Sequence, residues 1–513
     1  MSEVLFGQAY YLRFDAKLWA AMQPYPPLGT LYAAGYLRSR GYDVALFDAM
    51  LAESEQAWDQ ALAREQPRFA VLYEDHFNYL TKMCLLRMRE AALTMIEMAR
   101  TRGCTVIVCS SDASDHAETY LARGAHFILV GEGEETLAEL MDRLTGRTDT
   151  PFEAIQGLAF PDLLDEHRII HTPRRNVIKD LDALPRPAWD LADIPRYRDV
   201  WYRRHGYFSM NMVTSRGCPF HCNWCAKPIW GQRYHARSPE NVAAEMKWLK
   251  DTYRPDHLWF MDDMMGIKPG WTARLAMVLE ELDVHIPFKC LNRVDLLLRD
   301  GEIDALKQAG CRIVWTGVES GSQHILDAMD KGITVEQTRE AARRLHDAGM
   351  QVGFFIQFGY PGETRDAIEQ TFQLVRDCRP DQIGVSVSYP LPGTPFYEAV
   401  KAQLGVKQHW IDSDDLAMLY RGPFTTGFYR KLHRVLHKEF RSRQAWHALR
   451  SVGRRPATGR NPLREAAALL YHTVTLPFAR LHLERLATVP HDGIRPLPRH
   501  MTTEEAATPA PFQ

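Results

Sequence analysis

Residues 215–225 read Ser215-Arg216-Gly217-Cys218-Pro219-Phe220-His221-Cys222-Asn223-Trp224-Cys225. The three cysteines form a CxxxCxxC run, and this short spacing lets three thiolates converge on one iron–sulfur cluster. Three protein ligands leave one iron of a [4Fe–4S] cluster without a protein ligand. The stretch therefore predicts a cluster with one open iron, at which chemistry can take place.

Zinc is the main alternative for these cysteines. Structural zinc sites usually take four ligands from two well-separated pairs. His221 could be the fourth ligand, but its neighbour Cys222 makes joint tetrahedral coordination awkward. Disulfides are disfavoured, because nine cysteines are an odd and sparse number for 513 residues and the N-terminus lacks the order of a secretion signal. Three buried, inert cysteines are the remaining alternative.

The composition is that of an ordinary globular protein, long enough for two or three domains. Hydrophobic residues make up 46% of the chain and charged residues 25%, and the net charge is −2. No apolar run reaches the roughly 18 to 20 residues that a membrane span needs. We therefore expect a cytoplasmic enzyme without a nucleic-acid partner.

Residues 1–145 are predicted to form a doubly wound α/β domain. Short apolar runs alternate with helical periods, of which Leu85–Thr101 is the clearest, and this alternation is typical of βαβ units around a parallel sheet. Such sheets bind ligands at the carboxyl ends of their strands. The expected strands are Val44–Phe47, Phe69–Tyr73, Val106–Cys109 and Phe127–Val130.

Residues 146–205 are predicted to be a linker, and residues 206–400 a partial (β/α)6 barrel. The linker is rich in proline and charge, and each proline keeps its predecessor out of a helix. Active residues of barrels gather at the carboxyl ends of the strands. The six expected barrel strands are Met210–Thr214, His257–Met261, Phe288–Leu291, Ile313–Gly317, Val352–Phe358 and Ile383–Ser388.

The cysteine motif, with Trp224 before its last cysteine, resembles that of the radical S-adenosylmethionine (SAM) superfamily. Three blocks ahead of it, residues 26–31, 41–44 and 131–136, resemble the cobalamin-binding domain of one subgroup. That subgroup includes radical SAM C-methyltransferases and the anaerobic magnesium-protoporphyrin monomethyl ester cyclase. The resemblance implies a [4Fe–4S] cluster, SAM and cobalamin as cofactors.

The resemblance also implies which residues meet cobalamin. No DxHxxG sequence is present, so the cobalt is expected to lack the histidine ligand that this motif provides. His76 follows a strand and could approach the corrin face, or it could be an ordinary loop histidine. The expected cobalamin-binding residues are Pro27, Gly29, His76, Gly131, Glu132 and Gly133.

SAM is expected at the ends of the barrel strands. Its carboxylate needs a cation, for which Arg293 is suited, and its amine and ribose need polar partners such as Glu319 and Ser320. Asp262 and Asp263 either contact SAM or cap the following helix. Gly359 lies in a loop that resembles the adenine-side loop of the family. The cysteines Cys218, Cys222 and Cys225 are expected to be both metal-binding and catalytic.

Radical methylation of an unactivated carbon or phosphorus centre is the leading interpretation. In the family, cobalamin carries a methyl group from one SAM, and the 5'-deoxyadenosyl radical from a second SAM activates the substrate, with cofactors doing the hard chemistry. A radical cyclase, ring-contraction or carbon–carbon coupling enzyme is an alternative. A non-catalytic cobalamin or iron–sulfur sensor is another. A small-molecule substrate and an external low-potential electron donor are implied.

The C-terminal region is expected to form a helical cap over the barrel mouth at residues 401–500, followed by a disordered tail at 501–513. Helical periods cover Phe428–Val452 and Leu463–Leu486. From Arg421 to His500, 16 Lys and Arg face 4 Asp and Glu. Such a segment can lie on an anionic membrane or face an amphiphilic, lipid-like substrate, or it can be a solvated amphipathic helix.

Overall fold

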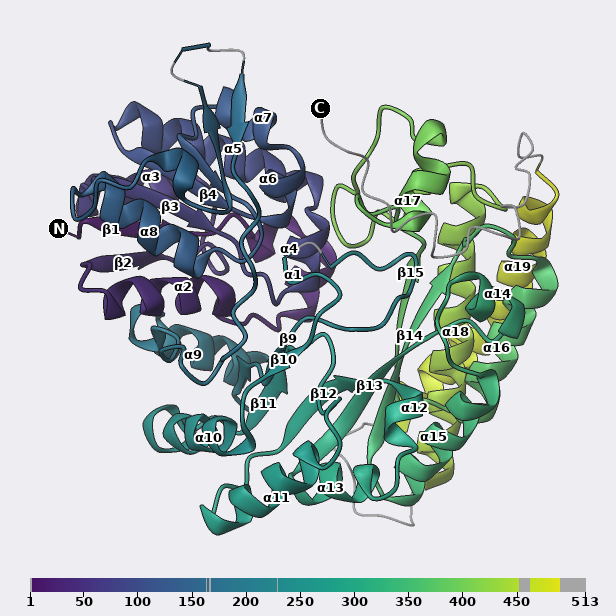
Figure 1. Ribbon diagram of the computed structural model, residues 1–513. Helices are drawn as coiled ribbons and strands as arrows, with labels where there is room; N and C mark the ends of the chain where they lie inside the picture. The colour runs from purple at the N-terminus through teal and green to yellow at the C-terminus, as the bar shows by residue number, and fades with distance from the viewer. Residues whose placement is uncertain (1, 163, 166–167, 228, 452–461, 490–513) are drawn as a thin grey trace.

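A computed structural model describes residues 2–162, 164–165, 168–227, 229–451 and 462–489. Two large sheets dominate it, a seven-stranded sheet in the N-terminal third and a six-stranded sheet formed between residues 209 and 387 (Figure 1). No helix within those described ranges is long and apolar enough to span a bilayer.

The first sheet has the strand order β2-β1-β3-β4-β5-β6-β7, in which the first five strands are parallel and the last two antiparallel. Helices α2 and α8 pack together, and so do α3 and α5, on the two faces of the sheet (Figure 1). The predicted doubly wound fold is confirmed. The strands are β1 (Val4–Gly7), β2 (Val44–Phe47), β3 (Phe69–Tyr73), β4 (Thr105–Cys109), β5 (Phe127–Leu129), β6 (Leu158–Pro161) and β7 (Ile169–His171).

The second sheet, of order β15-β14-β13-β12-β11-β8, is parallel throughout and curls into a half-barrel, as predicted. Its convex face is covered by helices (Figure 1). The strands are β8 (Ser209–Met212), β11 (His257–Phe260), β12 (Phe288–Asn292), β13 (Cys311–Glu319), β14 (Gln351–Phe358) and β15 (Gln382–Val387), and β9 (Ser215–Arg216) pairs separately with β10 (His235–Ala236).

Helix α5 confirms the helical period that was predicted at Leu85–Thr101. Those of the N-terminal half and linker are α1 (Ala16–Ala21), α2 (Leu28–Ser39), α3 (Gln56–Glu65), α4 (Tyr79–Met83), α5 (Leu86–Thr101), α6 (Ser111–Asp115), α7 (Ala117–Ala122), α8 (Glu134–Leu144) and α9 (Ile194–His205). Those of the half-barrel are α10 (Pro239–Tyr253), α11 (Trp271–Glu281), α12 (Val294–Leu297), α13 (Glu302–Gln308), α14 (Gln323–Ala328), α15 (Val335–Asp347) and α16 (Arg365–Cys378). Short 3₁₀ turns occur at Leu12–Phe14, Phe152–Ala154, Trp189–Leu191 and Lys401–Gln403.

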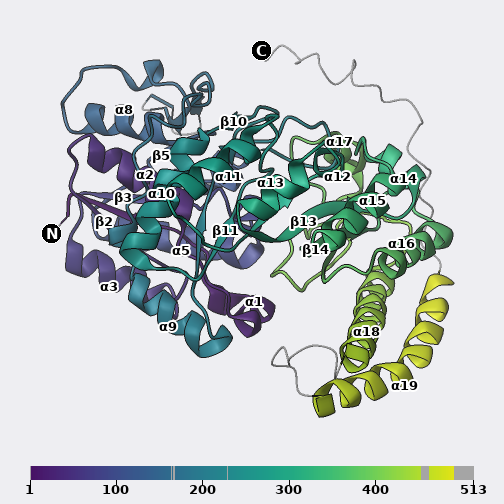
Figure 2. The same cartoon turned by 90° about the horizontal axis from the view of Figure 1, so that it is seen from below.

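The C-terminal helices lie at the outer edge of the half-barrel, which corrects the expected cap over its mouth. After α17 (Pro395–Val400), helix α18 (Thr426–Ser451) runs beside α16 and β15, and α19 (Pro462–Ala487) packs on α18 (Figure 2). Gln444 donates to the carbonyl of Asp381 before β15 (2.8 Å). Because the apolar face of α18 packs here, with Leu432 fully buried, α18 takes the place of a sixth barrel helix. The tail expected at 501–513 lies outside the described residues.

Candidate functional site

The cysteine loop starts immediately after β9, at the carboxyl ends of the half-barrel strands. Gly217 makes the turn into the loop with φ +82°, and a Cβ atom here would lie 2.3 Å from the carbonyl oxygen of Arg233. A side chain at this position would be strained and would collide with backbone. Gly217 therefore fixes the direction in which Cys218 leaves the strand.

The three thiols lie close enough for each to affect the charge of another. Cys222 is buried, and Cys218 and Cys225 are partly buried. Burial raises the pKa of Cys225 to about 12; Lys227 opposes this shift, and the Cys222 and Cys218 thiols add to it. Three thiolates this close are stable together only around a cationic centre, so the donor set fits an iron–sulfur cluster. His221 is exposed beside buried Cys222, an arrangement that does not favour a shared zinc ion.

Asn223 ties the cysteine loop to the rest of the half-barrel. Its side chain donates to the carbonyl of Ala328 (2.8 Å) and accepts from the hydroxyl of Tyr360 (2.8 Å). Its backbone N–H donates to the carbonyl of Met329, and its carbonyl accepts from Phe396 N–H, both at 3.1 Å. The side-chain amide also donates to Asp330 (3.1 Å), so the middle of the loop is held by five hydrogen bonds to three separate segments.

Arg293 lies at the cysteine loop, but its donors already have partners. The guanidinium lies 3.7 Å from the ring centroid of Phe220, between Cys218 and Cys222 in the chain. It donates to Asp295 (2.9 Å) and to the carbonyls of Lys331 (3.0 Å) and Gly332 (3.4 Å). The structure therefore places Arg293 beside the cluster loop, and its contact with the SAM carboxylate stays a prediction.

The side chains of Glu319 and Ser320 contact different parts of the half-barrel. Glu319, at φ +60°, forms a buried ion pair with Lys331 (2.8 Å), next to Gly317 on the half-barrel. Ser320 instead bonds to the hydroxyl of Thr371 on α16 (3.2 Å) and accepts from Ser322 N–H. Glu319 is thus near the cluster loop, whereas Ser320 is used in packing of the loop against α16.

The two neighbouring aspartates have separate tasks, and neither caps a helix, since Gly270 is the N-cap of α11. Asp262 accepts from Thr214 N–H and Oγ1 (both 2.8 Å) and from Ser215 Oγ (2.6 Å), so it fixes the chain just before the cysteine loop. Burial raises the pKa of Asp262 to about 6. Asp263 pairs with Lys82 of the N-terminal sheet domain (2.5 Å).

Gly359 begins the turn after β14, at φ +84°. Its N–H donates to Glu363 (2.8 Å), and its carbonyl accepts from the hydroxyl of Tyr420. A Cβ here would lie 3.0 Å from Met418 Cε. The segment between α17 and α18 therefore covers this glycine.

Arg216, which sequence reasoning did not single out, joins the two sheets directly ahead of the cysteines. It pairs with Glu132 (2.5 Å) and Glu134 (2.8 Å) from the loop after β5, and all three side chains are buried. Trp230 also donates to Glu132 (3.1 Å). Burial alone would raise the pKa of Glu134, but the charge of Arg216, its hydrogen bond, a backbone hydrogen bond and the charge of His76 together lower that pKa. The contact between Arg216 and Glu132 could not be predicted from the sequence, because the two residues are 84 positions apart.

The glycines of the N-terminal blocks are required by packing. A Cβ on Gly133 would lie 2.6 Å from Cys109 Sγ, and one on Gly29 would lie 2.9 Å from the backbone nitrogen of His76. Gly131 turns with φ +86°, and Pro27 is the N-cap of α2. These glycines let three loops converge at the carboxyl edge of the sheet, and their contact with cobalamin stays a prediction.

His76 lies beside the point where the strand order reverses, between β1 and β3, which is where ligands bind in this class of sheet. Its Nε2 lies 3.5 Å from Cys109 Sγ, and its ring meets that of Trp230 edge-on at 6.4 Å. Burial lowers the pKa of His76 to about 3. The imidazole is therefore neutral, as a metal ligand must be. It is also closely packed against its neighbours, as an ordinary buried histidine is.

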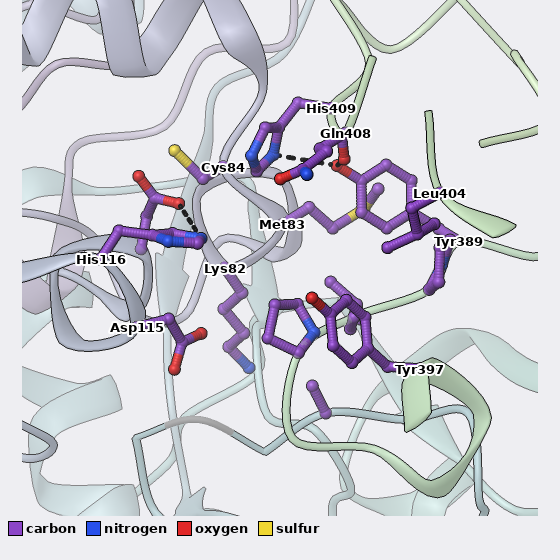
Figure 3. A pocket seen from close by; sticks show the side chains of 15 residues that line it. Lys82, Met83, Cys84, Asp115, His116, Tyr389, Tyr397, Leu404, Gln408 and His409 are labelled. Carbon is purple, nitrogen blue, oxygen red and sulfur yellow. Dashed lines mark hydrogen bonds and ion pairs between the residues drawn. The ribbon is translucent and has the colours of Figure 1, made fainter. Parts of the chain in front are cut away.

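A cavity of about 40 Å³ lies between the two sheets, next to the cysteine loop. Figure 3 shows Lys82, Asp115 and His116 of the N-terminal domain on one side, facing Tyr389 and Tyr397 on the other. His409 completes the wall and bonds to the hydroxyl of Tyr389 (3.2 Å). Ala226, next to Cys225, also lines the cavity, which therefore joins the predicted cobalamin edge to the predicted cluster.

The sequence matches known proteins over the half-barrel and beyond. Residues 212–375 match the model of the Radical SAM superfamily. The chain is 29% identical to an uncharacterized methyltransferase of Pyrococcus horikoshii over 55% of this chain and 60% of the relative. It is 25% identical to the anaerobic magnesium-protoporphyrin IX monomethyl ester cyclase of Rubrivivax gelatinosus, over 73% of this chain and 66% of the relative. The chain thus spans less than two thirds of the length of these relatives.

Among solved structures, the fold is similar to that of the cobalamin-dependent SAM radical enzyme OxsB. The TM-score is 0.68 at 16% identity, and the match covers 94% of this chain and 72% of OxsB. At this identity the likeness concerns the fold, and it extends over both sheets described above.

Proposed function

Because residues 212–375 form a radical SAM domain, we propose that this chain is a cobalamin-dependent radical SAM enzyme that methylates an unactivated carbon or phosphorus centre of a small molecule. The observation that carries the proposal is the cysteine loop, held between a half-barrel and the ligand-binding edge of a doubly wound sheet. When bound, the cluster supplies an electron for SAM cleavage, and cobalamin supplies a methyl group.

The chain's own residues hold the three thiols in place for this chemistry. Asn223 and Gly217 set the path of the loop, and Asp262 anchors the residues before it. Cys218, Cys222 and Cys225 would hold the cluster, and Glu319 and Arg293 are the residues proposed to orient SAM. Arg216, with its two buried carboxylates, keeps the cobalamin edge in register with the cluster. Burial of this interface excludes water from a radical.

Cobalamin binding requires the interface to open. A cavity of about 40 Å³ holds a water molecule but not a corrin ring. His76, held neutral, and His116 and His409 beside the cavity are the imidazoles within this region. We infer that the loop after β3 and the segment after α17 separate when cobalamin enters.

The test is an anaerobic assay of reconstituted protein with methyl-labelled SAM and a low-potential reductant. Deoxyadenosine formation together with transfer of label to a product supports methylation. Deoxyadenosine without label transfer would support the cyclase alternative, which the Rubrivivax relative favours. A reconstituted protein that carries cluster and cobalamin yet never cleaves SAM would support the sensor. A Cys222→Ala variant is the matched control, because it removes one cluster ligand.

We further propose that the C-terminal helices contact an anionic lipid surface, from which an amphiphilic substrate is taken. The outer face of α19 exposes Leu470, Val474, Phe478 and Leu481, with Phe478 72% exposed. A helix that is apolar on all sides is normally covered on all sides. Arg485 lies on the same face, and α18 and α19 together carry 10 Lys and Arg against 3 Asp and Glu. The charge suits anionic lipid better than a second copy of the same helices.

Cosedimentation with vesicles tests this contact. We expect the full chain to bind vesicles containing phosphatidylglycerol and to bind phosphatidylcholine vesicles at least tenfold less tightly. Phe478→Asn combined with Leu470→Asn should abolish binding, whereas Met277→Asn, at an exposed apolar residue of α11, should not. Equal binding of all three proteins would refute the contact.

A further inference from the structure

The concave face of the half-barrel carries a lysine that the proposed function does not use. Successive side chains of a strand point to opposite faces of the sheet. On β12, Phe288 and Cys290 are fully buried and point toward the covering helices, so Lys289 and Leu291 face the concave side. Lys289 is the second residue of the strand and lies three residues before its end at Asn292. At about 3.3 Å per residue, its Cα is about 10 Å below the mouth where the cysteine loop sits.

The Lys289 ammonium group is surrounded by aromatic rings and has no anion. Its Nζ lies 4.2 Å from the ring centroid of Trp259 and 5.6 Å from that of Tyr25. Within the part of the chain that the structure describes, no hydrogen bond or ion pair reaches Nζ. Burial lowers the pKa of Lys289 to about 8. His257 on β11 is a titratable neighbour: burial, with the Lys289 charge adding to it, lowers the pKa of His257 to about 4.

A second polar group beside this lysine also lacks a partner. Trp259 Nε1 is buried and makes no hydrogen bond within the described ranges. A buried donor without a partner is unfavourable, and a bound acceptor removes that cost. The ammonium and the indole N–H are the two kinds of donor that an anionic group would accept from.

An aromatic platform continues from this cation along the same face. Trp315 pairs in register with Leu291, and its ring stacks on that of Phe355 with centroids 4.6 Å apart and planes 28° apart. A Cβ on Gly353 would lie 2.4 Å from the Trp315 indole, and one on Gly384 would lie 3.1 Å from the Phe355 ring. Glycines at these two strand positions therefore allow both rings to lie flat against the sheet. Phe355 remains 38% exposed.

We propose that Lys289 binds the anionic group of a flat, aromatic substrate whose ring system lies on Trp315 and Phe355. This inference rests on the proposed function, because it concerns the substrate of that site. It sets the anion on the concave face beside Lys289, whose Cα is about 10 Å below the mouth where the cysteine loop sits. A carboxylate and a phosphate share the required chemistry, so the site selects a planar anion rather than a neutral lipid.

Equilibrium dialysis of the anaerobically reconstituted full chain tests this site with three probes: 2-naphthoate, 2-naphthyl phosphate and neutral 2-naphthamide. We expect at least one anion to bind tenfold or more tightly than the amide. Lys289→Met should remove this preference, Lys289→Arg should keep most of it, and Lys307→Met, at an exposed lysine of α13, should leave it unchanged. Because only the protonated lysine attracts the anion, the preference should fall as the pH rises above about 8.

The outcomes separate this inference from the function on which it rests. The inference is wrong if the anions and the amide bind equally, or if the preference for anions survives in Lys289→Met. In either case the proposed function still stands as long as the same preparation cleaves SAM. Absence of SAM cleavage overturns the proposed function whatever the probes do. Lys289→Arg guards against misfolding of Lys289→Met, since it keeps the charge and nearly the same length. Which anion binds more tightly distinguishes carboxylate from phosphate.

Discussion

Arg216 stands two residues ahead of Cys218 and is bonded to carboxylates of the other sheet, Glu132 and Glu134. Its neighbours in sequence give no sign of this role. Glu132 was expected to meet cobalamin because its glycine-rich turn resembles a block of the cobalamin-binding subgroup, yet its oxygens accept from Arg216, Trp230 and Ile178 N–H. The cysteine loop and its place after a barrel strand were predictable from the sequence, and cluster ligation by its three cysteines stays a prediction. Ion-pair partners far apart in the chain were not predictable.

Replacing Arg216 by Met should destabilise the protein by about 3–5 kcal/mol, because it leaves two buried carboxylates without a counter-ion. Urea unfolding of the full chain measures the loss. Adding Glu132→Gln and Glu134→Gln to Arg216→Met should restore much of the stability. If the triple variant is as unstable as the single one, packing of the guanidinium rather than its charge is the cause.

Glu74 should make the folded state less stable as the pH rises from about 4.5 to 8. Burial raises the pKa of Glu74 to about 8 from its ordinary value of 4.5. In this window the folded chain holds a proton that the unfolded chain has released, so each pH unit costs up to about 1.4 kcal/mol. Glu74→Gln should flatten the pH dependence of the urea midpoint between pH 5 and 8. Glu118→Gln, at an exposed position, should not alter it.

At the scale of elements, apolar runs located the strands well but not completely. Each of the six half-barrel strands was found, since every one is a short, largely apolar run between helical periods. The run Val4–Gly7 was overlooked because no helical period precedes it, yet β1 lies between β2 and β3 and is central to the sheet. The β6–β7 hairpin was assigned to the linker, because an antiparallel edge does not follow the βα alternation.

The loop between β9 and β10 depends on Asn223, so Asn223→Ala should lower the iron content of the reconstituted protein severalfold. The change removes the bonds to Ala328 and Tyr360, each worth about 1 kcal/mol, and frees the middle of the loop. Iron and sulfide analysis after anaerobic reconstitution is the measurement. Tyr360→Phe, which removes only one of these bonds, should have a smaller effect. Full iron content in Asn223→Ala would show that the cysteines alone set the loop.

The whole molecule is held together by the segment between α17 and α18, whose place was not predictable. A helical cap was expected, because the basic and apolar residues of the C-terminal region suggest a cover. Instead Ser413 bonds to Asp15 (2.8 and 3.0 Å), and Trp410 accepts from Leu86 N–H (2.8 Å), so residues 404–420 join the half-barrel to the first sheet. Such long-range contacts leave no periodic pattern in the sequence.

Loosening this connection should speed cobalamin entry. Ser413→Ala removes the hydroxyl bond to Asp15 without changing the half-barrel, and we expect hydroxocobalamin to associate several times faster, as seen by its absorbance change. Ser442→Ala, at a partly buried serine on α18, is the control. An unchanged association rate in Ser413→Ala would place the entry route elsewhere.

The bond between Glu132 and Arg216 also bears on how the chain is made. The two residues are 84 positions apart, so at about 5–20 residues per second the ribosome adds the arginine about 4–17 s after the glutamate. During that interval the nascent first sheet exposes two acidic side chains that have no counter-ion. The carboxyl edge of the first sheet can therefore be completed only after the strand that carries Arg216 has been translated. For this reason we expect the two halves of the protein to fold poorly when they are expressed separately.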